Sequence, residues 1–241
     1  MNKVVKGILI AVLACAAIYF VPRIVLSTLI SNFPERKTVV FLDDHSLKDE
    51  KTYKVEKENI VVHIPTYYNN CQEVKELSSF VCDAHVKNKQ LLVIYRPFDD
   101  VADKIMPGYS KEYRQALAKF ENSSLPFPLS ITHKTPDDLF EVMKVVYSAD
   151  KNDFNFWNLS ESLYLHHLLT AREEAEKESM IIHALYERDN IRAIVAEDST
   201  SPGTYAVLIV PDSSTGNIYA MVIKTSDMDD ITKLLNTYEF K

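Results

Sequence analysis

One stretch of this sequence constrains it more than any other. Residues 7–30 read GILIAVLACAAIYFVPRIVLSTLI, with Arg23 as the one charged side chain. As a helix this stretch would span about 36 Å, against about 30 Å for the hydrocarbon core of a bilayer. Lys3 and Lys6 precede it, as basic residues precede the apolar part of a signal or anchor sequence. We therefore expect residues 1–30 to form an uncleaved membrane anchor, a signal-anchor, that contacts lipid through residues 7–30.

Three alternatives to the anchor stay open. The small residues Ala14, Ala16 and Ala17 could precede a cleavage site, but cleavage there would leave a strongly apolar end on a soluble protein. Cys15 could carry a lipid, although the polar linker that normally follows a lipidated cysteine is missing. The run could also be a buried core helix, which is rarely this long and this apolar.

The charges that flank the apolar run hardly favour either orientation in a membrane. Lys3 and Lys6 on one side face Arg23, Arg36 and Lys37 on the other. The short N-terminal tail favours an N-terminus in the cytoplasm. We therefore expect a single-pass membrane protein whose folded part lies outside the cytoplasm, on the periplasmic side if the source is a bacterium.

The composition indicates that the rest of the chain folds. Of all residues, 46% are hydrophobic and 25% are charged, which is ordinary for a globular protein. Residues 31–37, which include Pro34, are expected to form a short stalk, and residues 38–241 a single extracytoplasmic domain. The formal net charge of −7 argues against a nucleic-acid partner, because phosphate binding requires a positively charged face.

The apolar patterning of this domain predicts an α+β fold, with a mainly antiparallel sheet packed with helices. Residues 205–210 and 218–223 are apolar on both faces, which is typical of strands in the middle of a covered sheet. They form one predicted hairpin, and residues 180–186 and 191–196 form another. Further strands are expected at 38–42, 53–64 and 91–95, and helices at 73–85, 99–105, 109–120, from Thr135 onwards, at 159–178 and at 227–236.

Cys71 and Cys82 are the two cysteines outside the apolar run, and an exported domain could join them in a disulfide. Along one helix their separation would be about 16 Å, whereas a disulfide needs Cα atoms within about 7 Å. Because residues 73–85 look helical, bridging requires Cys71 to fold back from a loop before that helix. We therefore expect two buried or free thiols, with a Cys71–Cys82 disulfide as the alternative.

The scarcity of glycine argues against several enzyme classes. No two of the four glycines lie close enough to build a phosphate-binding loop, a dinucleotide fingerprint or a G-x-S-x-G elbow. Those motifs need glycine where the backbone touches a ligand or adopts positive φ. Kinases, P-loop NTPases, standard Rossmann enzymes and typical α/β-hydrolases are therefore disfavoured, and we expect no cofactor. The glycines are Gly7, Gly108, Gly203 and Gly216.

Candidate metal ligands have simpler structural explanations, so we expect no metal site. His166 and His167 are adjacent on a predicted helix, so they point about 100° apart and cannot chelate one ion from one face. Acidic residues within 99–103 and 227–230 suit the positive N-terminal ends of helices. Ser226 is a candidate cap for the second of these helices.

Three aromatic residues, Phe154, Phe156 and Trp157, stand just before the helix predicted at 159–178. Such a cluster is expected to pack at the start of the helix. An exposed patch that faces a partner or lipid is the alternative.

No arrangement of residues in the sequence identifies a reaction. We therefore expect a non-catalytic domain that binds a protein or an envelope component. The first alternative is a membrane-tethered hydrolase that uses His45, His63 or His183. Residues 43–46, Asp-Asp-His-Ser, are read as a polar turn, because the members of a catalytic triad usually converge from distant segments. The second alternative is a small-molecule-binding domain, which an apolar cavity between sheet and helices would favour.

Overall fold

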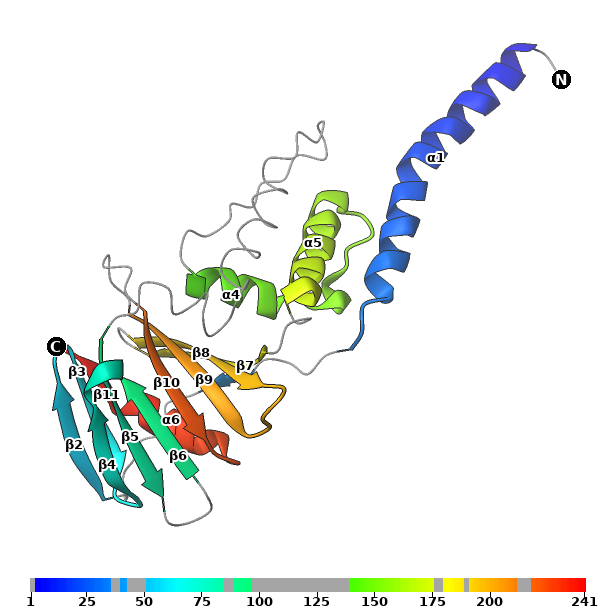
Figure 1. Ribbon diagram of the computed structural model, residues 1–241. Helices are drawn as coiled ribbons and strands as arrows, with labels where there is room; N and C mark the ends of the chain where they lie inside the picture. Colours follow the sequence, from blue (N-terminus) through cyan, green and yellow to red (C-terminus); the bar gives the residue numbers. More distant parts are fainter. Residues whose placement is uncertain are drawn as a thin grey trace.

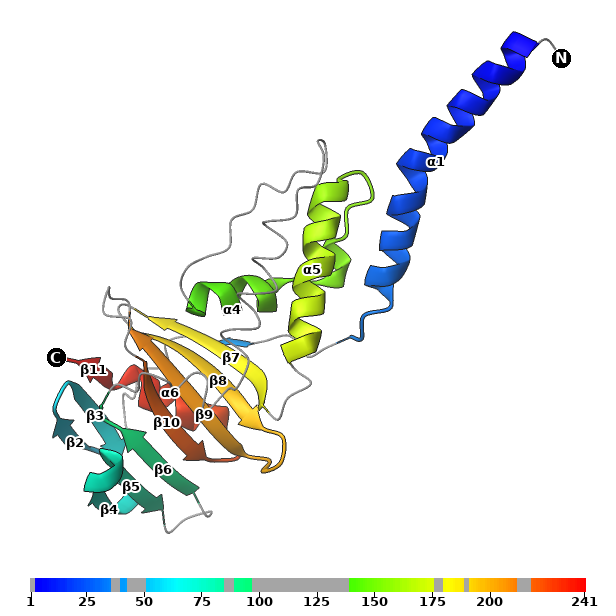
Figure 2. The same ribbon diagram turned by 45° about the horizontal axis from the view of Figure 1, so that its top comes forward.

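The computed structural model describes residues 3–35, 40–42, 51–84, 89–96, 139–175, 180–188, 191–211 and 218–241. A long helix, α1 (Lys3–Ser31), stands out from a body of strands and shorter helices (Figures 1 and 2). The C-terminal end of α1 meets this body, and its N-terminal end lies far from it. The architecture is α+β, as the sequence predicts.

The centre of the body is an eight-stranded sheet, and most of its strands lie where the sequence predicts them. Within the described strands, neighbours in this sheet pair antiparallel, except that the strand at 40–42, at one edge, pairs in parallel with the strand at 180–188. Both predicted C-terminal strand pairs are confirmed. The strands are β1 (Val40–Leu42), β4 (Tyr68–Val74), β5 (Ser79–Ala84), β6 (Lys89–Ile94), β7 (Met180–Arg188), β8 (Ile191–Asp198), β9 (Thr204–Pro211) and β10 (Tyr219–Lys224), in the spatial order β1-β7-β8-β9-β10-β6-β5-β4.

The middle strands are apolar on both faces because both faces of the sheet are covered. Successive side chains of a strand point to opposite faces. In β9, Val207 and Ile209 belong to one core cluster, and Ala206 and Leu208 belong to the other. The double-sided burial that the sequence predicts for residues 205–210 is therefore confirmed.

One face of the sheet is covered by a helix and a small second sheet. The helix is α6 (Met228–Asn236), whose buried Ile231, Leu234 and Leu235 belong to the same core cluster as Val207 of β9. The small antiparallel sheet has the strand order β11-β3-β2. Its strands are β2 (Thr52–Lys57), β3 (Ile60–Pro65) and β11 (Tyr238–Phe240).

The opposite face is covered by two helices, α4 (Leu139–Ser148) and α5 (Leu159–Ala175), which are joined through a 3-10 turn, η2 (Lys151–Asp153). Phe140 and Val146 of α4 pack in a second core cluster with strand residues such as Leu208. Figure 2 shows α4 and α5 between the sheet and α1. The body therefore has layers, and α5 is the element that separates α1 from the sheet.

The helix predicted at residues 73–85 is wrong. Residues 73–84 form the end of β4, a 3-10 turn, η1 (Lys75–Leu77), and β5. Phe80, Cys82 and Ala84 of β5 alternate into the core, which a strand permits and a helix does not. Pairing of β5 with both β4 and β6 overrides the local helical pattern.

Other predicted elements differ in their limits. The strand expected over 53–64 is two strands, β2 and β3, joined by a turn at Glu58, whose φ is 35°. The helix expected from Thr135 is described from Leu139 onwards, as α4. The helices predicted at 99–105 and 109–120 lie outside the described residues.

Candidate functional site

The most distinctive feature of the structure is the junction between α1 and α5. Leu26 and Ile30, near the end of α1, are buried against Leu165 and Leu169 of α5. Toward its N-terminal end α1 carries large apolar side chains on its exposed surface, such as Ile10. Among the described residues, Val5–Ser31 is the one helix that is long and apolar enough to cross a membrane.

Phe33 and Lys151 extend this junction beyond the end of α1. The ring of Phe33 lies edge-on to the imidazole of His166, with 5.6 Å between the ring centroids. Burial lowers the pKa of His166, which favours the neutral imidazole. Lys151 of η2 donates to the carbonyl of Phe33 at 3.4 Å and pairs with Glu35 at 3.5 Å. The end of α1 is therefore fixed to the folded body by both apolar and polar contacts.

Of the three aromatic residues before α5, one is packed in the fold and one is largely exposed to solvent. Phe154 packs against the α1–α5 cluster, as expected, whereas the side chain of Trp157 is 70% exposed. Phe156 lies between them and also reaches α1, because its ring stacks on that of Phe20 with 6.3 Å between centroids. We call residues 154–157 the aromatic turn.

A disulfide joins Cys71 of β4 to Cys82 of β5. The register of the two strands shifts between Asn69 and Gln72, so that Asn70 and Cys71 form a bulge opposite Cys82. The Cα atoms of the two cysteines are 4.1 Å apart, in place of the wide separation that a helix would impose. The expectation of free thiols depended on the helix at 73–85, and it is wrong for the same reason.

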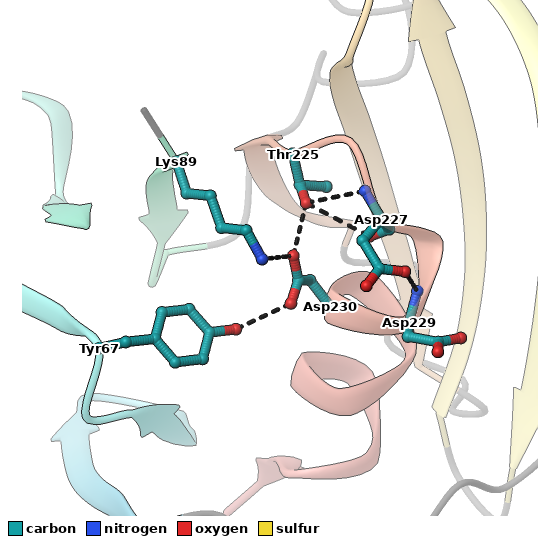
Figure 3. A network of polar contacts seen from close by, with 6 residues as sticks. All are labelled: Tyr67, Lys89, Thr225, Asp227, Asp229 and Asp230. Carbon is teal, nitrogen blue, oxygen red and sulfur yellow. Dashed lines mark hydrogen bonds and ion pairs between the residues drawn. The ribbon is translucent and has the colours of Figure 1, made fainter. Parts of the chain in front are cut away.

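A buried polar network connects α6 to the large sheet and to the turn between β3 and β4 (Figure 3). The carboxylate of Asp230 accepts hydrogen bonds from the ammonium of Lys89, from the hydroxyl of Tyr67 at 2.9 Å and from the hydroxyl of Thr225 at 2.5 Å. Lys89 begins β6, Tyr67 stands before β4 and Thr225 follows β10. Asp227 caps α6 by accepting from the backbone N–H of Asp229 at 3.0 Å, so the cap is not Ser226.

The electrostatics of this network indicate a structural ion pair. Burial alone would raise the pKa of Asp230, but the hydrogen bonds from Lys89, Thr225 and Tyr67 outweigh burial and hold the pKa below its ordinary value. The carboxylate is therefore ionised at neutral pH and occupied by its donors. It is poorly placed to take a proton from a substrate, because general bases need a pKa near the operating pH.

A shallow hollow of about 330 Å³ opens beside Lys89. Its lining is largely polar and charged, and the amine of Lys89 turns toward Asp230. The hollow lies at the end of the sheet rather than between sheet and helices, and it differs from the apolar cavity that a small-molecule site would favour. The residues that line it are Asp83, Ala84, Lys89, Gln90 and Lys224.

The two described histidines proposed for a hydrolase, His63 and His183, lie in different sheets. His63 lies on β3, where Val62 and Ile64 face the core, so the alternation of the strand directs His63 away from it. His183 lies on β7, and its Nε2 atom is 2.8 Å from the carboxylate of Glu197. His45 lies outside the described residues.

The pair of His183 and Glu197 has a structural role in the sheet. The second carboxylate oxygen of Glu197 accepts from the backbone N–H of Gly203 at 2.9 Å, in the turn between β8 and β9. Gly203 has a φ of 80°, which favours glycine at this position. The ring of His183 also lies edge-on to that of Tyr205, at 5.9 Å. These contacts fix the end of the sheet.

Metal ligation has no support within the described part of the chain. No group of three or more His, Cys, Asp or Glu side chains there is arranged to hold an ion. The acidic residues at 99–103 and the turn at 43–46 lie outside the described residues.

Comparison with known proteins adds no family to this picture. No protein-family model matches the chain, and no curated protein sequence matches it significantly. The function is therefore argued from the chemistry of the chain itself.

Asp230 and Trp157 are the residues whose roles sequence reasoning missed. The sequence explains Asp230 by the helix dipole alone, but its donors Tyr67 and Lys89 are 163 and 141 residues away in the chain. The sequence predicts that Trp157 packs at the start of α5, but its side chain is exposed, next to Phe156, which contacts α1. Its position after two phenylalanines was the available signal, and the alternative of a lipid-facing patch used it.

Proposed function

We propose that this chain is a single-pass membrane protein whose folded domain, outside the cytoplasm, binds a protein or an envelope component without catalysing a reaction. The observation that carries the proposal is the contrast along α1. In its last two turns Leu26 and Ile30 are buried on α5, and large apolar side chains along the rest of the helix, such as Ile10 and Leu13, are exposed. A helix with that surface is stable in lipid and unstable in water.

The disulfide supports the outward orientation of the domain. Structural disulfides form in the periplasm, the secretory pathway and outside the cell, and they are rare in reducing cytosol. Cys71 and Cys82 lie in the folded part of the chain, on the C-terminal side of α1. A domain on the cytoplasmic side would be expected to keep both thiols reduced.

The polar clusters of the domain support a binding role. Lys89 with Asp230 and His183 with Glu197 connect elements of the fold, and both pairs are occupied by internal partners. A catalytic acid or base needs access to a substrate atom. The surface of the domain, rather than these pairs, is therefore proposed to carry the function.

The membrane part of the proposal is tested by alkaline carbonate extraction of membranes from cells that make the full chain. We expect the chain to stay with the membrane pellet, and the variant Ile10→Lys with Leu13→Lys to be extracted, because charges at mid-helix are costly in lipid. A matched control is Ile10→Ala with Leu13→Ala, which keeps the helix apolar. Release of the unaltered chain into the supernatant contradicts anchoring.

The orientation is tested with thiol labelling by a maleimide polymer that shifts the chain on a gel. In denatured, unreduced samples we expect one label, on Cys15, and three after reduction. Three labels before reduction, in chain trapped rapidly from cells, would place the domain in a reducing compartment.

The binding part is tested by crosslinking in intact membranes, followed by purification in detergent. We expect one reproducible partner that is lost on competition with an excess of unlabelled full chain. The hydrolase alternative predicts instead that the purified chain turns over ester or peptide substrates, and that His63→Gln or His183→Gln abolishes the turnover.

A further inference from the structure

We propose that the aromatic turn is a second membrane contact, in which Phe156 and Trp157 enter the interfacial layer of the bilayer that α1 crosses. The inference rests on the proposed function, because it requires α1 to lie in lipid. It goes further by assigning an orientation to the domain, with the N-terminal end of α5 directed at the membrane.

The first step places the edge of the hydrocarbon on α1. Leu26 and Ile30 pack against α5, and α5 carries charged side chains at Glu161 and Arg172. Charged side chains on a helix are expensive inside a bilayer, so α5 lies outside the hydrocarbon. The part of α1 in contact with α5 lies outside with it, and the hydrocarbon must end before Leu26.

The charged residues of α1 independently place the end of the hydrocarbon at the same part of the helix. Lys6 and Arg23 bracket an uncharged stretch of helix about 24 Å long. Long basic side chains at each end extend toward the headgroups, so a stretch of this length fits a hydrocarbon core of about 30 Å. The guanidinium of Arg23 lies over the ring of Tyr19, 3.7 Å from its centroid. Basic and aromatic side chains together are typical of the membrane interface.

The second step places the aromatic turn at this limit. Phe20 precedes Arg23 by about 4.5 Å of helix rise, so it lies just inside the boundary. Phe156 stacks on Phe20, and Trp157 adjoins Phe156 with 5.2 Å between ring centroids. Figure 1 shows the segment before α5 rising beside α5 on the side of α1, toward the N-terminal end of α1.

The segment at 150–157 changes from charged to aromatic side chains as it approaches the proposed membrane boundary. It begins with η2, where Asp150 and Asp153 form a capping box and Lys151 contacts Phe33, beyond the end of α1. It then rises to Phe156 at the level of Phe20. The acidic residues are thus at the end far from the proposed boundary, and the aromatic residues are at the boundary.

Trp157 itself has the chemistry of an interfacial residue. Its side chain is 70% exposed although it is the largest in the turn, and its backbone N–H donates to the side chain of Asn155 at 3.0 Å, which holds the turn in shape. An indole has an apolar body and one N–H donor, and tryptophan is enriched where lipid headgroups meet hydrocarbon. Water is a poor environment for this ring, and the interface suits both its parts.

The test uses the fluorescence of Trp157, the one tryptophan in the chain. The full chain is reconstituted into vesicles of phosphatidylcholine and phosphatidylglycerol, with bromine atoms either near the headgroups or near the ends of the acyl chains. We expect a short-wavelength emission maximum, weak quenching by acrylamide, and stronger quenching by the shallow bromines than by the deep ones.

The matched control moves the reporter to the other side of the body. Leu77 in η1 is 57% exposed, and η1 connects β4 to β5, which lie at the end of the body away from α1 (Figure 2). In the variant Trp157→Phe with Leu77→Trp, we expect long-wavelength emission, strong quenching by acrylamide and no quenching by either brominated lipid. A second variant, Phe156→Ala, should reduce the lipid quenching of Trp157 without changing the amount of chain on the vesicles.

The outcomes separate this inference from the proposed function. If the chain floats with the vesicles and resists carbonate, but Trp157 behaves like the Leu77→Trp reporter, the aromatic turn is in water and the inference is wrong while the anchor stands. If the unaltered chain does not float with the vesicles, both proposals fall.

Discussion

The ammonium of Lys89 and the carboxylate of Asp230 meet across the space between β6 and α6, with only 11% and 4% of the two side chains exposed. Removing two such charges from water is costly, and the cost is recovered only when the remaining hydrogen-bonding positions are filled. Tyr67 and Thr225 fill them on Asp230. The pair therefore fixes how α6 sits against the large sheet.

Replacing Asp230 by Asn should destabilise the domain by about 3 kcal/mol, because the ammonium of Lys89 is left without its counter-charge. Unfolding of the full chain in detergent by denaturant measures the loss. The control is Asp229→Asn, one residue earlier and exposed, which should cost less than about 1 kcal/mol. Addition of Lys89→Met to Asp230→Asn should recover part of the loss, and equal losses in the two single Asp variants would contradict the role of the pair.

The stability should also depend on pH through Asp230. The pKa of Asp230 is lower in the folded chain than in the unfolded chain. In acid, the carboxylate therefore binds a proton less readily in the folded state than in the unfolded state. The contribution of ionised Asp230 to the free energy of unfolding is complete above the ordinary pKa of aspartate. It is lost as the pH falls through the lower pKa of the folded state. The difference in unfolding free energy between the unaltered chain and Asp230→Asn should therefore shrink below about pH 4. A difference that stays constant down to pH 2 would show that the carboxylate is not stabilised in its charged form.

Loss of the disulfide should lower stability by about 2–5 kcal/mol, the usual cost of removing a native bridge from a small domain. The change is Cys71→Ser with Cys82→Ser, and thermal unfolding in detergent with and without reductant is the measurement. Reductant should lower the Tm of the unaltered chain and leave that of the double variant unchanged. Cys15→Ser is the control, because Cys15 is free and lies on α1 outside the folded body. A Tm insensitive to reductant in the unaltered chain would rule out a stabilising bridge.

The α1–α5 junction should weaken when Ile30 is truncated. Ile30 is 1% exposed, and Ile30→Ala removes buried methyl groups worth about 2–4 kcal/mol at such a site. Hydrogen exchange of the full chain in lipid nanodiscs should show faster exchange in the first half of α5. Leu29→Ala provides the comparison, since Leu29 is 46% exposed and its truncation should leave α5 unaffected. Similar exchange in both variants would mean that α1 and α5 do not support one another.

Apolar patterning predicted the elements whose burial is decided locally. Residues 205–210 alternate between two cores, and α6 presents Ile231, Leu234 and Leu235 on one face, so spacing alone identifies both. The helix prediction for residues 73–85 is wrong because Val74, Leu77 and Phe80 recur at a spacing that is typical of helices. The pairing of β5 between β4 and β6 decides the structure there, and those partners are not encoded within the segment.

The polar sites were less predictable because their partners are distant in sequence. Asp230 has a sufficient local explanation at the start of a helix, and Tyr67 and Lys89 come from the other half of the chain. The Cys71–Cys82 disulfide is only the alternative in the sequence analysis because the helix predicted at 73–85 separates the two cysteines, so the error lies in the secondary structure. The exposure of Trp157 depends on where α1 stands relative to α5, which no pattern within residues 154–157 specifies.

The bulge in β4 has a consequence for contacts between copies of the chain. Within the described strands, β4 ends the eight-stranded sheet, and an edge strand that is open and regular invites a strand from a neighbouring molecule. Asn70, with a φ of 57°, and the bridged Cys71 interrupt that edge halfway along its length. An incoming strand would lose its register at this point, so the bulge makes the β4 edge a poor template for fibrous aggregation.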